Sequence, residues 1–322
     1  MADGRIVDQR WLRGLLGRVV FGVAAGCGAV ATAAGHRTAN FIVEAPTPAL
    51  ARRIGDAAEQ YRHDLAVEWL GQPLPRWSRP CPISAEVAPH LGAGGATSFV
   101  FDKGEVFNWT MTIQGSEERI LDSVLPHEIT HTIFATHFRQ PLPRWADEGA
   151  CTTVEHPVER ARQHRLLVEF LSTGRGIAFP DMFAMREYPA DVLPLYSQGY
   201  SLARFLIERG GRHKYVAFVG AGLATENWPA ALDSHYGVGD LAQLQHVWLE
   251  WVKKGCPAPP AAVAGLPAPS AVALAASAPR ARGQSPDSGF DSSLDTDVVP
   301  VHVPQGPAAM NISGRKSIYA RQ

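Results

Sequence analysis

The chain has 322 residues, of which 46% are hydrophobic and 19% are charged, and its formal net charge is −1. This is the composition of a globular protein that is long enough for one large domain or two small ones. Because the charges nearly balance and the pI is about 6.9, the composition excludes the basic surface of a nucleic-acid-binding protein, and a protein, peptide or small-molecule partner is expected instead.

Residues 1–35 have the pattern of a targeting segment. Four arginines precede Val19–Gly35, a run of apolar and small residues without charge. Ala31 and Ala33 resemble the small-residue cleavage site of a secretory signal. An uncleaved membrane anchor and a buried N-terminal helix stay open as alternatives, although the run is short for a spanning helix. The first two interpretations predict an exported protein that is periplasmic, secreted or tethered to the cell envelope.

Strand and helix patterns follow the leader. Phe41–Pro46 is typical of a strand that ends at proline, and Pro48–Leu70 has apolar residues at helical spacing. Pro82–Val87 and Thr97–Gly115 indicate strands, and the second of these turns back as a hairpin at Asp102–Gly104. These elements predict a small, mostly antiparallel sheet in the first part of the domain.

Helical patterns dominate the rest of the chain up to residue 256. Ser116–Glu118 begins a helix with acidic residues at its start, and Pro126 either kinks that helix or begins a separate one. Further helical patterns cover Val154–Gly174, Tyr200–Arg209, His213–Val219 and Leu241–Lys253. We therefore expect one α+β domain over residues 36–256. Residues 257–322 are rich in alanine and proline without sustained periodicity, which predicts a disordered tail.

The cysteines allow a disulfide without identifying it. Cys27 lies in the leader, which leaves Cys81, Cys151 and Cys256 in the predicted domain. Three cysteines in an exported domain permit one disulfide and one free thiol. Their spacing does not say which pair forms, and it contains no CxxC pattern of a cysteine metal site.

The stretch LPHEITHTIF contains two histidines four residues apart, His127 and His131, with Glu128 directly after the first. On a helix, residues four apart lie on one face, one turn from each other, so both imidazoles can reach one zinc ion. Glu128 is then placed to take a proton from a bound water. Apolar residues surround the motif at helical spacing, which favours a helix here.

A third protein ligand is expected because catalytic zinc usually has three, with a fourth position open. Glu148, seventeen residues beyond His131, lies in the stretch PRWADEGA, where a new helix is predicted to start. A glutamate at a helix start is also common without a metal. Its neighbour Asp147 either orients a ligand imidazole or caps that helix. His137 is interpreted as a surface histidine or as one that contacts a metal ligand without binding the metal.

HEITH followed by PRWADEGA resembles the gluzincin branch of zinc metallopeptidases, the MA-like superfamily that includes thermolysin and aminopeptidase N-type enzymes. In this family the third zinc ligand is a glutamate on a downstream helix. Its usual context is matched by Trp145, Glu148, Gly149 and Ala150. The resemblance covers roughly Ser116–Gly211. It implies a zincin-like catalytic domain with one zinc ion per chain.

The resemblance extends to LYSQG. In the aminopeptidase N-like relatives a Tyr-x-x-Gly opens a later helix, and its tyrosine hydrogen-bonds the tetrahedral intermediate. Tyr196 and Gly199 stand in the matching places, and Tyr200 is the nearest competitor. By itself, Tyr196 has the pattern of a half-buried packing residue with its hydroxyl in water. Only the resemblance implies that it is catalytic.

The resemblance also implies a substrate-binding strand, because in gluzincins an antiparallel edge strand above the zinc helix pairs with the substrate backbone. Glu105–Gly115 is placed for that role, and an ordinary core hairpin is an equal alternative. The G-x-M-E-N motif, with which aminopeptidase N relatives grip a free amine, is absent from the sequence. An endopeptidase, or an enzyme acting on a peptide-like envelope substrate, is therefore expected.

The resulting hypothesis is a zinc metallopeptidase that hydrolyses peptide bonds of exported or envelope proteins. His127, His131 and Glu148 hold the zinc, Glu128 assists the attack of zinc-bound water, and Tyr196 stabilises the oxyanion. The alternative is a catalytically inactive zincin-like binding or scaffold protein of the cell envelope. The sequence does not indicate an oligomeric state.

Overall fold

The computed structural model describes residues 34–185, 187–257 and 318–321 of the chain. The predicted leader and the predicted disordered tail lie almost entirely outside these residues, so both expectations stay predictions. Among the described helices, none combines the length and the apolar character that crossing a membrane requires.

The described strands form one mixed sheet in the order β1-β2-β3-β5-β4-β6. The strands are β1 (Ala34–Arg37), β2 (Phe41–Ala45), β3 (Cys81–Val87), β4 (Gly94–Asp102), β5 (Glu105–Gly115) and β6 (Ile318–Arg321). β1 is antiparallel to β2 and β4 to β5, whereas β2–β3, β3–β5 and β4–β6 are parallel. The prediction of a mostly antiparallel sheet is therefore wrong. The physical reason is that helix α1 (Pro48–Leu70) connects β2 to β3 as a crossover, which makes these strands parallel.

β5 is an interior strand over Met111–Gln114, so of the two alternatives for Glu105–Gly115 the core hairpin holds there and the edge strand is wrong. It pairs with β3 on one side and with β4 on the other. The hairpin between β4 and β5 turns as predicted, with positive φ at Lys103 and Gly104. Because β5 pairs with β3, its hairpin partner β4 lies on the side of β5 away from β3. β4 is therefore the strand whose outer side is available for pairing, and β6 uses part of it, at Ser98–Phe101.

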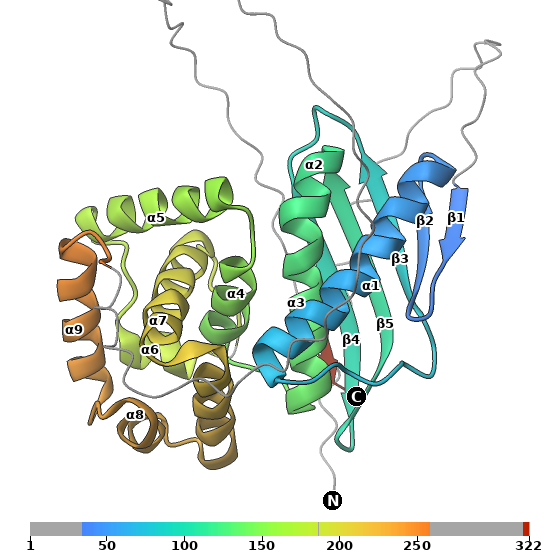
Figure 1. The fold of residues 1–322 in the computed structure, drawn as a ribbon. Coiled ribbons are helices and arrows are strands. Elements are labelled where there is room, and N and C mark those ends of the chain that lie inside the picture. Colours follow the sequence, from blue (N-terminus) through green and yellow to red (C-terminus); the bar gives the residue numbers. More distant parts are fainter. Residues whose placement is uncertain (1–33, 186, 258–317, 322) are drawn as a thin grey trace, which may run out of the picture.

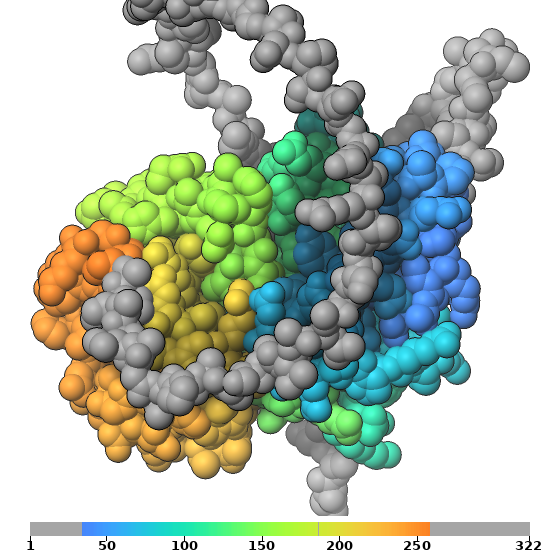
Figure 2. Space-filling view, in the orientation of Figure 1, coloured from blue at the N-terminus to red at the C-terminus, as the bar shows by residue number. Residues whose placement is uncertain are grey.

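The remaining described chain is helical. α1 and α3 lie over one face of the sheet (Figure 1), and α5, α8 and α9 lie on the side of the molecule away from β1 and β2 (Figure 2). The helices after α1 are α2 (Glu117–Arg119), α3 (Leu125–Phe138), α4 (Arg144–Thr153), α5 (Pro157–Ser172), α6 (Phe179–Ala184), α7 (Leu193–Thr225), α8 (Trp228–Tyr236) and α9 (Leu241–Lys253). The α+β class is confirmed: a small mixed sheet comes first and a helical part follows.

Several helix boundaries differ from those predicted. The two helices expected at 200–209 and 213–219 are parts of α7, which is interrupted at Gly211, where φ is 77° and ψ is 171°. Pro126 lies in the first turn of α3, directly after a π-helical turn at Ile120–Val124. The chain is helical on both sides of Pro126, because Val124 and Leu125 have right-handed helical φ and ψ and the Leu125 N–H bonds to the Ile120 carbonyl. Pro126 therefore lies inside one helical run from Glu117 to Phe138, and the prediction of a separate helix beginning there is wrong; the π-helical turn is the local irregularity at the proline.

The core lies between the sheet and the helices that cover it. On β3, Ile83 and Ala85 are buried while Ser84 and Glu86 are exposed, the alternation of a strand with one covered face. α3 is buried along its whole length from Leu125 to Ala135. The sheet covers one side of α3 and the helical part covers another (Figure 1). Polar side chains on this helix therefore need partners inside the protein.

α4 and α7 cross in direct backbone contact. A Cβ atom at Gly149 would lie 2.3 Å from the carbonyl oxygen of Gly199. A Cβ atom at Gly199 would lie 2.8 Å from the carbonyl oxygen of Trp145. Any larger residue at either position would push the helices apart. The glycines that follow Glu148 and Tyr196 in the sequence thus bring the start of α7 against the helix that carries Glu148.

Candidate metal centre

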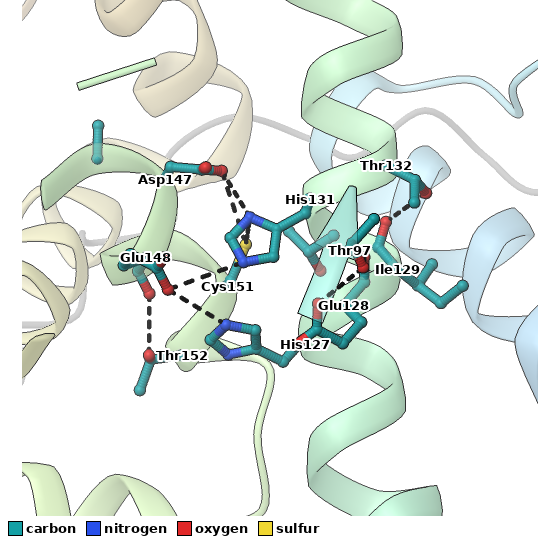
Figure 3. Close-up of polar contacts among 12 residues, drawn as sticks. Thr97, His127, Glu128, Ile129, His131, Thr132, Asp147, Glu148, Cys151 and Thr152 are labelled. Atoms are coloured by element: carbon teal, nitrogen blue, oxygen red, sulfur yellow. Dashed lines mark hydrogen bonds and ion pairs between the residues drawn. The ribbon is translucent and has the colours of Figure 1, made fainter. Parts of the chain in front are cut away.

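The three side chains predicted to bind a metal converge in the structure (Figure 3). His127 and His131 lie on α3, and Glu148 lies in the middle of α4, because that helix begins at Arg144. The Nε2 atoms of both histidines face Glu148 Oε2, at 3.4 Å from His127 and 3.8 Å from His131. Two separate helices therefore supply one cluster of donors.

A carboxylate holds the other ring nitrogen of each histidine. Glu155 Oε1 lies 2.7 Å from His127 Nδ1, and Asp147 Oδ1 lies 2.9 Å from His131 Nδ1. Since a carboxylate accepts hydrogen bonds, Nδ1 carries the proton in each ring and Nε2 presents its lone pair towards Glu148. Asp147 thus orients an imidazole, the first of the two roles left open for it. Glu155 does the same for the other histidine.

These donors fit a divalent cation. Glu148 Oε2 is buried and accepts no hydrogen bond from the described residues. In tetrahedral coordination with bonds of about 2.0–2.1 Å, two ligand atoms lie about 3.3–3.4 Å apart, close to the separations found here. Buried carboxylates require a cation or hydrogen-bond donors nearby. The cluster contains several that are at most 3% exposed: Glu128, Asp147, Glu148 and Glu155.

Cys151 on α4 is an alternative third ligand beside the two histidines. Ligand atoms of His127, His131 and Cys151 lie within 4.8 Å of one another, so this buried group could hold a metal ion. The sulfur lies 3.3 Å from His131 Nδ1, the nitrogen that Asp147 already holds. Burial raises the pKa of the Cys151 thiol when no metal is bound. The two Nε2 atoms instead face Glu148.

Cys81, Cys151 and Cys256 are all free and buried. The disulfide that three cysteines permit is therefore not formed among the described residues. The reason is spatial: Cys81 begins β3, Cys151 lies on α4, and Cys256 follows α9.

The surroundings of His131 favour positive charge. Burial by itself lowers the pKa of His131, but the Asp147 carboxylate and Cys151 raise it, and the resulting pKa lies well above its usual range. An environment that stabilises a protonated imidazole also stabilises a metal cation bound to that ring. The electrostatics and the donor geometry therefore agree.

Glu128 follows His127 on α3 and faces Thr97 of β4 (Figure 3). Its Oε2 accepts a hydrogen bond of 2.7 Å from Thr97 Oγ1. A Cβ atom at Gly95 would lie 2.7 Å from Glu128 Oε1, so only glycine leaves room for this carboxylate. Gly95 also lines a hollow of about 260 Å³ formed by residues of β3, β4 and β5. β4 therefore fixes the position of Glu128.

A tyrosine that the sequence did not indicate contacts the cluster. The Tyr188 hydroxyl donates a hydrogen bond to Glu148 Oε1. Burial and the charge of Glu148 raise the pKa of Tyr188, which keeps the hydroxyl protonated. Tyr196 stacks on Tyr188 with ring centroids 6.3 Å apart, whereas Tyr200 lies near the charge of Arg204. Of the two tyrosines considered from the sequence, Tyr196 is thus the one beside the cluster.

The remaining residues separate into those that the sequence indicated and those that it did not. His137 is exposed and packs on Phe138, as expected of a surface histidine. Thr97, Glu155 and Tyr188 were not predicted. Metal-binding histidines usually donate a hydrogen bond to a carboxylate or carbonyl. That rule could have pointed to Glu155, a carboxylate that follows the helix of the third ligand.

Comparison of the chain with protein-family models gives no match, and comparison with curated proteins gives none either. Any assignment of function therefore depends on the chemistry of the site. The residues that carry it extend from Thr97 on β4 to Tyr196 on α7.

Proposed function

We propose that the chain is a zinc-dependent metallopeptidase of the gluzincin type, with His127, His131 and Glu148 as the ligands of one Zn²⁺ ion. The observation that carries the proposal is the convergence of two Nε2 atoms on Glu148 Oε2. Catalytic zinc typically has three protein ligands, which bind through nitrogen or oxygen, and a fourth position that is open. The α+β arrangement of the chain is compatible with a zincin-like fold.

His127, His131 and Glu148 would hold the zinc ion, which would supply Lewis-acid chemistry there, polarising the scissile carbonyl and lowering the pKa of a bound water. Glu128 is the general base, which takes a proton from the attacking water and passes it to the leaving amine. Thr97 holds Glu128 Oε2, so Oε1 is the oxygen that moves the proton. The Tyr196 hydroxyl donates a hydrogen bond to the developing oxyanion, and loss of such a donor typically costs about 2.7–4 kcal/mol.

β4 replaces Glu105–Gly115 as the strand that pairs with a peptide substrate. Within the described residues, only β5 pairs with Gly94–Thr97, whereas β6 pairs with the following part of β4. Gly95 and Thr97 contact the carboxylate of Glu128. An extended peptide that adds to this edge has its backbone beside the general base. This geometry favours cleavage within a peptide chain.

Exported or cell-envelope proteins are the proposed substrates, because residues 1–35 have the pattern of a secretory leader or an N-terminal anchor. Cell fractionation combined with N-terminal sequencing tests this part of the proposal. A mature protein that begins near residue 34 outside the cytoplasm supports a cleaved signal. A full-length protein in the membrane fraction supports an anchor, and a full-length protein in the cytoplasm contradicts both.

A second candidate function follows from the burial of the site. His127, Glu128 and Glu148 are each 1% exposed. A buried zinc ion with every coordination position filled by protein is structural. The chain would then be a zincin-like binding or scaffold protein of the envelope without catalytic activity.

Two measurements on matched variants separate these candidates. Elemental mass spectrometry of the purified protein should find one zinc per chain, and Glu148→Ala should lose it. Casein or a quenched peptide library should be cleaved by the wild type and left intact by Glu128→Gln, while Glu128→Gln keeps its zinc. Zinc binding without any cleavage that depends on Glu128 would favour the binding protein.

A further inference from the structure

The two carboxylate oxygens of Glu148 have different surroundings. Oε2 faces the Nε2 atoms of His127 and His131. Oε1 accepts a hydrogen bond from the hydroxyl of Tyr188. One oxygen is thus directed to the metal position, and the other is held by a tyrosine.

Tyr188 is itself fixed by packing. Its ring stacks on Tyr196 with an interplanar angle of 28°, and the guanidinium carbon of Arg144 lies 4.4 Å from its ring centroid. Arg144 begins α4, and Tyr196 lies in the first turns of α7. A ring held by two helices has little rotational freedom. The Tyr188 side chain therefore loses little conformational entropy when its hydroxyl bonds to Glu148.

The number of Glu148 oxygens on the metal decides whether the site has room for water. A carboxylate can bind a metal through one oxygen or through both. With one, the protein supplies three ligand atoms and a fourth position is open. With both, the second oxygen takes the position that a water or a substrate carbonyl needs.

We propose that Tyr188 is a positioning residue that restricts Glu148 to binding the metal through Oε2 alone, and so keeps one coordination position open. This role rests on the proposed zinc site. It also gives the second oxygen of Glu148 a partner when the metal is bound, as carboxylate ligands commonly require. Tyr188 acts through Glu148 and is separate from Tyr196, which is assigned to the oxyanion.

Cobalt substitution tests this role without any substrate. The wild type, Tyr188→Phe and Tyr196→Phe are compared at saturating Co²⁺, with one cobalt per chain verified by elemental analysis and the fold by far-UV circular dichroism. The two variants are matched because each removes one hydroxyl from one of two stacked rings. In Tyr188→Phe the visible cobalt spectrum should change in band position and intensity, since a second oxygen of Glu148 replaces the water at the fourth coordination position. Tyr196→Phe should keep the wild-type spectrum.

The outcomes distinguish this role from the metal site itself. A Tyr188→Phe spectrum identical to that of the wild type at equal occupancy overturns the role of Tyr188 and leaves the metal site standing. Failure of the wild type to bind cobalt overturns both. If Tyr188→Phe does not fold, a crystal of the zinc-loaded wild type decides: Oε2 alone on zinc supports the role, and both oxygens on zinc refute it.

Discussion

Gly149→Ala perturbs the crossing of α4 and α7, on which the position of Glu148 depends. The new Cβ atom would lie 2.3 Å from the carbonyl oxygen of Gly199, whereas ordinary contact begins at 3.4 Å. The helices must therefore separate by about 1 Å, because both atoms that collide belong to rigid backbone or sit directly on it. Overpacking of this kind typically destabilises a protein by about 1–3 kcal/mol.

Thermal unfolding of the metal-free protein measures this effect. In a domain of about 150–250 residues each 1 kcal/mol shifts the Tm by about 2–4 °C, so Gly149→Ala should melt about 2–12 °C below the wild type. Gly220→Ala on α7 is the matched control. The nearest atom to its new Cβ is Phe138 Cε1 at 3.7 Å, and alanine inside a helix is better than glycine by about 0.5–1 kcal/mol. Equal or higher stability of Gly149→Ala would refute the close crossing.

The remaining predictions concern single contacts of the site. Glu155→Ala should raise the Kd for zinc by about 10–100-fold in a chelator competition, because His127 loses the partner of its Nδ1; an unchanged Kd would count against that contact. Thr97→Val should lower kcat on casein by about tenfold or more, since a hydrogen bond to a charged group is worth about 1.5–3 kcal/mol. Thr97→Ser should restore kcat, and equal kcat values in the valine variant and the wild type would exclude the positioning of Glu128 by Thr97. Alkylation of the denatured, unreduced protein should modify Cys81, Cys151 and Cys256, whereas a disulfide-linked peptide pair would contradict the structure.

The parts of the site that the sequence predicts are the local ones. His127, Glu128 and His131 lie within two turns of a helix, so their spacing alone sets their geometry. Glu148 lies on a different helix, and only the resemblance to gluzincins linked it to the histidines. Its helix begins earlier than expected, at Arg144. The sequence did not predict this start, because no residue typical of a helix N-cap precedes it in the stretch PRW.

The contacts made by tertiary structure have no local signature. Thr97 is 31 residues from Glu128, and Tyr188 is 40 residues from Glu148. Both reach their partners only because β4 lies beside α3 and because the segment after α6 folds back over α4. The same limit explains the error about β5. Alternation along a strand shows which face is buried, but it does not show which strands are its neighbours.

X-ray absorption at the zinc K edge of the zinc-loaded protein tests most directly which side chains hold the ion. We expect only nitrogen and oxygen atoms bound to zinc, at about 2.0–2.2 Å, with the outer scattering of two imidazole rings. A sulfur atom at about 2.3 Å would place Cys151 on the metal and contradict the ligand set of His127, His131 and Glu148.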